Sequence, residues 1–152
     1  MKHSLIIIGF MLTACVAPQP PSVTRIVCLN ENRTTSELNA FLHEFANENE
    51  LDAVDRSEVS RTNLLAMGAE FLEGADHDSI VVFLNFRDGR HFLTAGNISL
   101  SSKEAFVTTR IENRDAEMLD SLLDAELRDR WHIFQVDDEE VVVYGICTGR
   151  LN

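Results

Sequence analysis

Two apolar runs that flank an Asp-Gly pair constrain the fold of this chain more than any other feature. Residues 80–86 read Ile-Val-Val-Phe-Leu-Asn-Phe, and residues 91–95 read His-Phe-Leu-Thr-Ala. Asp88 and Gly89 lie between them, and an Asp-Gly pair in this setting is the strongest short-range signal for a β-hairpin. We therefore expect at least part of the core to be built on antiparallel strands.

A capping box and a helical stripe follow the first predicted strand. Residues 25–29 are apolar on both faces of an extended chain, which indicates a strand inside a sheet. Thr34 and Glu37 have the spacing of a capping box, in which each side chain binds the backbone of the other residue. The apolar residues after them repeat at the interval of one helix face, and they are Leu38, Phe41, Leu42 and Phe45.

Further elements are expected on either side of the hairpin. Residues 51–78 contain a weaker helical pattern that includes Gly68 and closes at Gly74. A later helix is expected to begin near Asn113. The weaker pattern is made by Leu64, Leu65, Phe71 and Leu72, and the inner stripe of the later helix by Leu119, Leu122, Leu123 and Leu127. The remaining strands are expected at residues 104–111, 131–136 and 141–148.

The order of these elements predicts the fold class. There is no sustained βαβ alternation and no internal repeat, so a parallel sheet and a solenoid are both disfavoured. We expect an α+β fold, a two-layer sandwich with a mostly antiparallel sheet and two or three helices packed on one face. Residues 25–152 are expected to form this single domain, which is large enough for a sizeable core.

The first residues have the composition of a targeting segment. Lys2 is followed by an apolar run at residues 5–12. Spanning a bilayer core takes about 20 apolar residues, so this run favours a secretory signal over a transmembrane helix. The run ends in Leu12-Thr13-Ala14-Cys15, which resembles the lipobox of bacterial lipoprotein precursors. The resemblance implies that residues 1–14 are removed as a signal peptide and that Cys15 is then lipidated.

The resemblance also implies where the mature protein lies. A lipidated Cys15 would attach it to a membrane of the bacterial cell envelope, and Val16 in place of an aspartate implies sorting to the periplasmic face of the outer membrane. Residues 15–24 contain three prolines and no charged side chain, so we expect an extended tether. The membrane is thus one expected partner, reached through the lipid anchor.

Charge limits the other partners. Cleavage removes Lys2 and changes the formal charge from −12 to −13. Such an acidic body argues against nucleic acid, because phosphates require basic surfaces. A basic periplasmic protein is compatible with this charge, and so is simple solubility.

Two cysteines remain beside the proposed anchor. Cys28 and Cys147 lie near the two ends of the predicted domain, and export to an oxidising compartment favours a disulfide between them. The alternative is two buried free thiols, which behave as small apolar side chains.

No motif in the chain assigns a catalytic residue, a metal or a cofactor. The G-x-S-x-G elbow of many hydrolases is absent, and the glycines form no phosphate-binding loop. Asp76-His77-Asp78 is the best local group of metal ligands, but no second group accompanies it. General acid–base chemistry by paired carboxylates stays open, because nothing in so acidic a chain distinguishes one pair.

Two surface features are candidate contacts for a partner. Arg87 and Arg90, with Asn85 and His91 beside them, form a local basic patch around the hairpin turn. The other feature is the acidic run Asp137, Asp138, Glu139 and Glu140. The more ordinary explanation of the basic patch is turn solubility and protection of a sheet edge, and that of the acidic run is a solvated hairpin tip.

These observations favour a non-catalytic binding or interaction module, such as an inhibitor, an immunity-type protein or an assembly accessory of the envelope. One alternative is a metal- or carboxylate-dependent envelope hydrolase, which would need Asp76, His77 or His132 to converge with other carboxylates in a pocket. The other is a structural envelope component.

Overall fold

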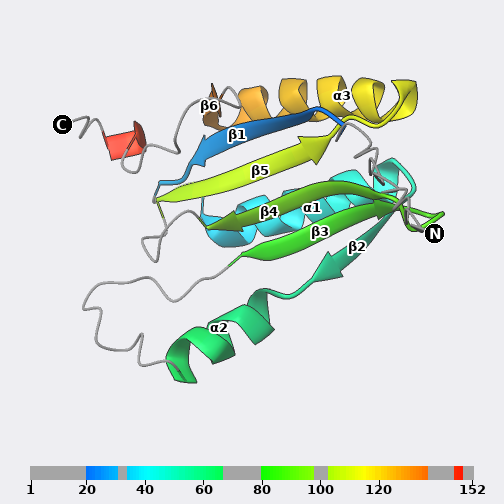
Figure 1. Cartoon of the computed structure of the whole chain (residues 1–152). Coiled ribbons are helices and arrows are strands. Elements are labelled where there is room, and N and C mark those ends of the chain that lie inside the picture. Colours follow the sequence, from blue (N-terminus) through cyan, green and yellow to red (C-terminus); the bar gives the residue numbers. More distant parts are fainter. Residues whose placement is uncertain (1–19, 31–33, 67–79, 98–102, 137–145, 149–152) are drawn as a thin grey trace, which may run out of the picture.

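The structure is a computed structural model, and it describes residues 20–30, 34–66, 80–97, 103–136 and 146–148. These residues form one sheet with helices behind it (Figure 1). The strands are β1 (Ser22–Cys28), β2 (Leu51–Asp55), β3 (Val81–Phe86), β4 (His91–Asn97), β5 (Glu104–Arg110) and β6 (His132–Val136). The helices are α1 (Thr35–Glu48), α2 (Ser57–Ala66), α3 (Arg114–Arg130) and the 3₁₀ helix η2 (Ile146–Thr148).

Every neighbouring pair of strands is antiparallel, and the order across the sheet is β2-β3-β4-β5-β1-β6. This sheet with its helices confirms the expected α+β fold. β1 lies between β5 and β6, so the prediction of an interior strand from its two apolar faces is also confirmed. Because of this position, the first strand of the domain pairs with β6, the strand that follows α3 (Figure 1).

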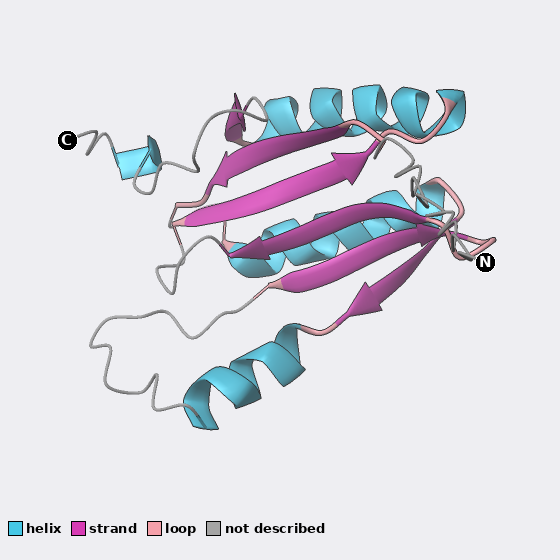
Figure 2. Ribbon diagram, viewed as in Figure 1, coloured by secondary structure: helices cyan, strands magenta, loops and turns pink. Residues whose placement is uncertain are grey.

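The core lies between the sheet and helices α1 and α3, which cover the same face (Figure 2). Leu123 and Leu127 are buried as expected, but Leu122 is 42% exposed and Ala116 is buried instead. Successive helix residues are rotated by about 100°, and in α3 Leu123 faces the sheet while Leu122 is turned away from it toward solvent. The largest fully buried residues include Leu38, Leu42, Phe45, Val82, Leu84 and Leu93.

Local capping fixes where the two long helices begin. The Glu37 backbone N–H donates to Thr34 Oγ1 at 3.4 Å, and the Thr34 N–H donates to Glu37 Oε2 at 2.7 Å. This reciprocal pair confirms the predicted capping box. Asn113 caps α3 in a similar way, because its side-chain oxygen accepts from the Ala116 N–H at 2.9 Å.

A buried arginine ties β1 to α3. Arg25 is only 2% exposed, and its guanidinium lies 2.8 Å from Asp120 Oδ1 and 2.7 Å from Asp124 Oδ1. Thr109 of β5 completes the group, since its hydroxyl binds both Arg25 and Asp120. A charge this far from water is tolerated only when it is paired and hydrogen-bonded, as it is here.

Strand β2 was not among the predicted elements. Its five residues pair with β3 at the edge of the sheet, and the turn before it contains neither glycine nor proline. Glu50 makes that turn with a φ of 56°, in the left-handed region where glycine is usual. The usual turn signal is therefore missing from the sequence.

Helix α2 differs from the weaker helical pattern in its placement. It spans Ser57–Ala66, whereas Gly68, Phe71, Leu72 and Gly74 lie outside the described residues. Asp55, at the end of β2, accepts from the Ser57 N–H at 2.8 Å and from Asn39 Nδ2 of α1 at 2.8 Å. Asp55 therefore joins the beginning of α2 to the middle of α1.

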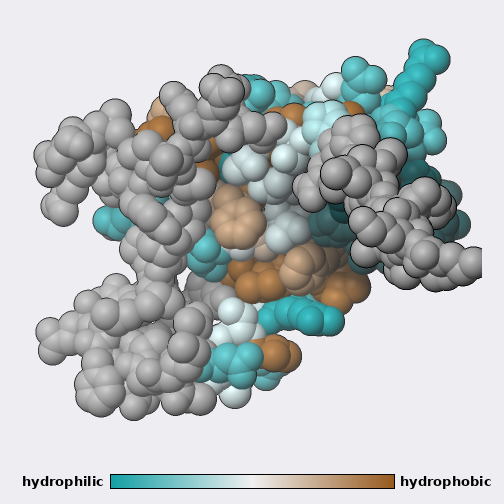
Figure 3. Space-filling model, viewed as in Figure 1, coloured by the Kyte–Doolittle hydropathy of each residue, from teal (hydrophilic) through white to brown (hydrophobic). Residues whose placement is uncertain are grey.

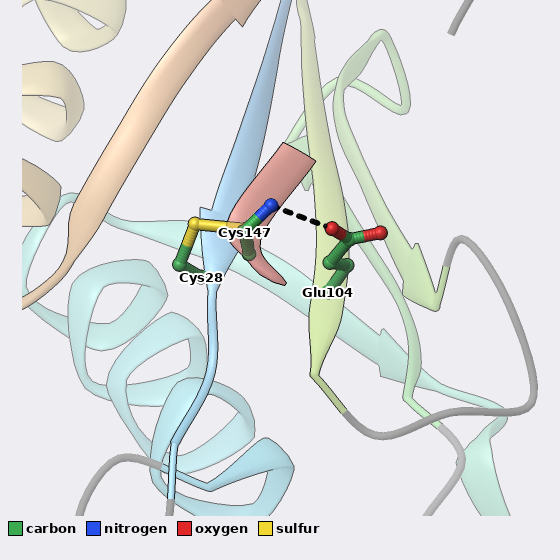
Figure 4. The surroundings of a disulfide bond; sticks show 3 residues. All are labelled: Cys28, Glu104 and Cys147. Carbon is green, nitrogen blue, oxygen red and sulfur yellow. Dashed lines mark hydrogen bonds between the residues drawn. A yellow bond between two sulfur atoms is a disulfide. The ribbon is translucent and has the colours of Figure 1, made fainter. Parts of the chain in front are cut away.

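The C-terminal region departs from the predicted strand at 141–148. Residues 146–148 form a 3₁₀ helix, and residues 141–145 lie outside the described residues. A disulfide joins Cys147 to Cys28 across a sequence separation of 119. The Cys147 N–H also donates to Oε1 of the buried Glu104 at 2.8 Å, so two bonds hold this helix to neighbouring strands (Figure 4).

The proposed signal peptide and the first half of the proposed tether, residues 15–19, lie outside the described residues. β1 begins at Ser22, earlier than the expected domain start at residue 25. None of the helices in the described ranges is both long and apolar enough to cross a bilayer.

Candidate functional site

A groove of about 730 Å³ follows the side of α1 that meets the end of α3. Two buried aromatic residues, Phe41 and Trp131, are among those that line it, and their ring centroids are 5.4 Å apart. The carboxylates of Glu44 and Glu48 line it as well, and both are exposed. The groove thus combines an aromatic surface with a negative rim.

One arginine of the chain already uses this combination. The Arg130 guanidinium carbon lies 4.6 Å from the centre of the Phe41 ring, and its Nη1 lies 3.5 Å from Glu44 Oε2. A cation over an aromatic face gains about 0.5–2 kcal/mol, depending on how far it is desolvated. The groove therefore has the chemistry that recognises a guanidinium group.

A second, smaller pocket of about 310 Å³ lies on the sheet face opposite the helices. It is lined by Val54 and Arg56 of the β2–α2 segment, Phe83 and Asn85 of β3, and His91 of β4. Figure 3 views this face of the sheet, where apolar side chains are visible among polar ones. The pocket combines apolar walls with one cation and two neutral polar groups.

His91 is fixed in this pocket by two side chains. Its Nδ1 lies 3.0 Å from Asn85 Oδ1, and its Nε2 lies 2.8 Å from Thr94 Oγ1. Because a carboxamide oxygen only accepts, Nδ1 carries the proton and Nε2 of the neutral ring accepts the Thr94 hydroxyl proton. Burial lowers the pKa of His91, and the nearby Arg110 lowers it further, while Glu112 acts in the opposite direction. The neutral ring is therefore favoured.

A β-bulge places His91 and Thr94 on one face. Residues three positions apart on a regular strand point to opposite faces. The β3–β4 register shifts between Leu84, which pairs with Leu93, and Asn85, which pairs with His91. Phe92 is thus the additional residue, and it is buried in the core next to Phe86. The sequence places Asn85 and His91 near the turn, but no pattern in it indicates a role for Thr94.

The order Thr94–His91–Asn85 resembles that of a nucleophile, a base and an orienting group. Acyl transfer also requires donors for the developing oxyanion. β4 lies between β3 and β5, so its backbone N–H groups near Thr94 are used in the two ladders. Thr94 is not among the residues that line the pocket. Within the described part of the chain, this geometry fits ligand binding better than covalent catalysis.

The sequence-predicted contact residues Arg87 and Arg90 are not among the residues that line the two cavities. Arg87 pairs with Glu50 at 3.4 Å, and Arg90 pairs with Asp88 at 2.7 Å. The Arg90 guanidinium also lies 4.9 Å from the Phe86 ring centre. These acids reduce the positive charge of the expected basic patch. Asp137, Asp138, Glu139 and Glu140 lie outside the described residues.

The metal-site candidates do not come together in the part of the chain that is described. There, His, Cys, Asp and Glu form no group of three or more able to hold an ion. His43 lies 3.4 Å from Asp55, and the His132 ring lies edge-to-face with the Phe134 ring. Asp76, His77 and Asp78 are outside the described residues.

Comparison with known proteins gives no relative: no family model, no curated protein and no solved structure matches the chain.

Proposed function

We propose that this protein is a lipid-anchored binding module of the bacterial cell envelope, which captures a basic segment of a partner protein without chemical turnover. The lipobox-like Leu12-Thr13-Ala14-Cys15 supports the anchor. The formal charge of −12 for the full chain supports a basic partner, since opposite charge accelerates and selects encounters.

The observation that carries the proposal is the position of Arg130 in the α1 groove. This arginine contacts the Phe41 ring and the Glu44 carboxylate at once. Glu48 lines the same groove and makes no ion pair within the described ranges. An arginine or lysine from a partner can therefore bind beside Arg130 and reach the Glu48 carboxylate, which no cation among the described residues pairs with.

The anchor and the groove define the proposed task together. A module on the periplasmic face of the outer membrane would hold its partner close to that membrane, as an inhibitor, an immunity-type protein or an assembly accessory does. Basic side chains on the partner would bind the groove, and the other acidic residues would attract the partner over longer distances.

The test uses mature lipidated protein in lipid nanodiscs. Partners captured from an envelope extract are identified by mass spectrometry, and the purified partner is then titrated against the wild type and against a Glu44→Gln/Glu48→Gln variant. The control is Asp52→Asn/Glu117→Gln, which removes the same charge from exposed positions outside the groove.

We expect capture of a basic protein whose affinity falls about tenfold or more in the groove variant, since a hydrogen bond to a charged group contributes about 1.5–3 kcal/mol. The control should stay within about threefold, as expected for surface charges. Equal affinity of both variants, or turnover of cell-wall or lipid substrates with no captured protein, would contradict the proposal.

A further inference from the structure

The pocket at Arg56 and His91 is separate from the α1 groove, and its chemistry points to a different kind of ligand. We propose that it binds a small carboxylate that carries an apolar group. The pocket offers a cation, a neutral amide and apolar walls, and none of these depends on the proposed partner of the groove.

Arg56 supplies the positive charge. It is exposed, and it makes no ion pair among the described residues, although most arginines there do. Its backbone N–H donates to the Val81 carbonyl at 2.8 Å, which fixes the base of the side chain against β3. A guanidinium matches a carboxylate with two parallel hydrogen bonds.

Asn85 supplies a neutral donor next to this cation. Its Oδ1 accepts from His91 Nδ1, which sets the orientation of the amide and leaves Nδ2 able to donate into the pocket. The neutral form of His91 adds no second charge. Arg56 is the one cation among the described residues that line the pocket, and on so acidic a protein this favours a monoanion over a phosphate dianion, which the surrounding carboxylates would repel.

Phe83 and Val54 supply the apolar walls. Val54 is 39% exposed on the edge strand, and Phe83 stands opposite it in the β2–β3 register. The Phe83 ring also lies 6.1 Å from the His91 ring, so the two rings form one side of the pocket. A volume of about 310 Å³ is near the lower limit for small-molecule pockets, about 300 Å³. It suits one ring or a short aliphatic chain.

The experiment is an NMR titration of the mature chain, ¹³C- and ¹⁵N-labelled, with phenylacetate as the probe. The His91 ring and the Asn85 side-chain amide are the reporters. Phenylacetamide has the same size without the charge, and N-acetyl-Ala-Phe with a free or an amidated carboxyl end represents a peptide terminus. The variant is Arg56→Gln, and the matched control is Arg114→Gln, which removes an exposed arginine far along the sequence in α3.

We expect saturable shifts at His91 and Asn85 with phenylacetate or with the free peptide. Arg56→Gln should weaken binding about tenfold or more, because a charge-assisted pair is lost, while Arg114→Gln stays within about twofold. Tighter binding of phenylacetate would identify free acids as the ligand, and tighter binding of the free peptide would identify a chain terminus.

Three outcomes would overturn the inference. They are no saturable shift with either anion, equal binding of the amides, and an unchanged affinity in a folded Arg56→Gln variant. The exposed position of Arg56 makes misfolding of that variant unexpected, and its thermal unfolding provides the check. Binding in the α1 groove is unaffected by any of these results, so the two proposals can fail separately.

Discussion

Replacing Arg25 with methionine removes the cation between β1 and α3 and keeps much of the apolar stem. Asp120, whose side chain is 14% exposed, would then be left without a cation. Asp124 would keep Arg128 at 2.7 Å. Loss of one partner from a buried ion pair costs about 3–5 kcal/mol. Because only one carboxylate is left unpaired and it is not fully buried, we expect a loss near the lower end, about 3 kcal/mol.

Guanidinium denaturation at pH 7 measures this loss, with the fluorescence of Trp131, the only tryptophan, as the probe. The control is Arg128→Gln, whose side chain is 51% exposed and should contribute only about 0.5 kcal/mol. If Arg25→Met and Arg128→Gln lower the free energy of unfolding equally, the buried ion pairs do not hold α3 on the sheet.

The pH dependence provides an independent check. Burial acts to raise the pKa of Asp124, but hydrogen bonds from Arg128 and Arg25 outweigh it and hold the pKa below its ordinary value. The stability from this group is therefore present above the unfolded pKa and is lost as the pH falls. In Arg25→Met, Asp124 loses one of these hydrogen bonds and protonates more easily, so the difference from the wild type should be smaller at pH 3 than at pH 7.

Cys15→Ser should abolish acylation and shift the protein to the aqueous phase of a detergent partition, and a variant that still incorporates labelled palmitate would contradict the proposed anchor. Reduction of Cys28–Cys147, whose separation is 119, should lower the free energy of unfolding by about 4–5 kcal/mol. Denaturation with and without reductant measures it, and equal midpoints would show that the cross-link does not stabilise the fold. Burial acts to raise the pKa of Asp55, but its hydrogen bonds lower it to about 2, so its contribution should be complete above about pH 4 and decline toward pH 2. Urea denaturation across this range should show a smaller decline in Asp55→Asn than in the wild type.

The elements that were correctly predicted are those with local signals. A few neighbouring residues are enough to specify the Asp88-Gly89 turn, where Gly89 has a φ of +84°, and the same is true of the capping box of α1. Strand β2 has no such signal, because Glu50 makes its turn and the pairing with β3 reaches across α2. The order of strands depends on contacts that are distant in the sequence, and local patterns do not encode those directly.

The two cavities were missed for related reasons. In the α1 groove, Glu44 and Arg130 are 86 residues apart and come together only when α1 and the end of α3 pack on the same face. In the pocket on the opposite face, Asn85 and His91 lay in the predicted hairpin, but the bulge at Phe92 decides which side chains share a face. An additional residue in a strand has no reliable signature in one sequence.

The position of β1 has a mechanical consequence. With the proposed anchor at Cys15, a pull between the membrane and a partner in the α1 groove enters β1 at Ser22 and passes along the whole strand to Cys28, from where the chain continues to α1. The ladders to β5 and β6 are perpendicular to that direction, so their bonds are loaded together in shear instead of being opened one by one. The strand nearest the anchor is thus the one best placed to carry tension.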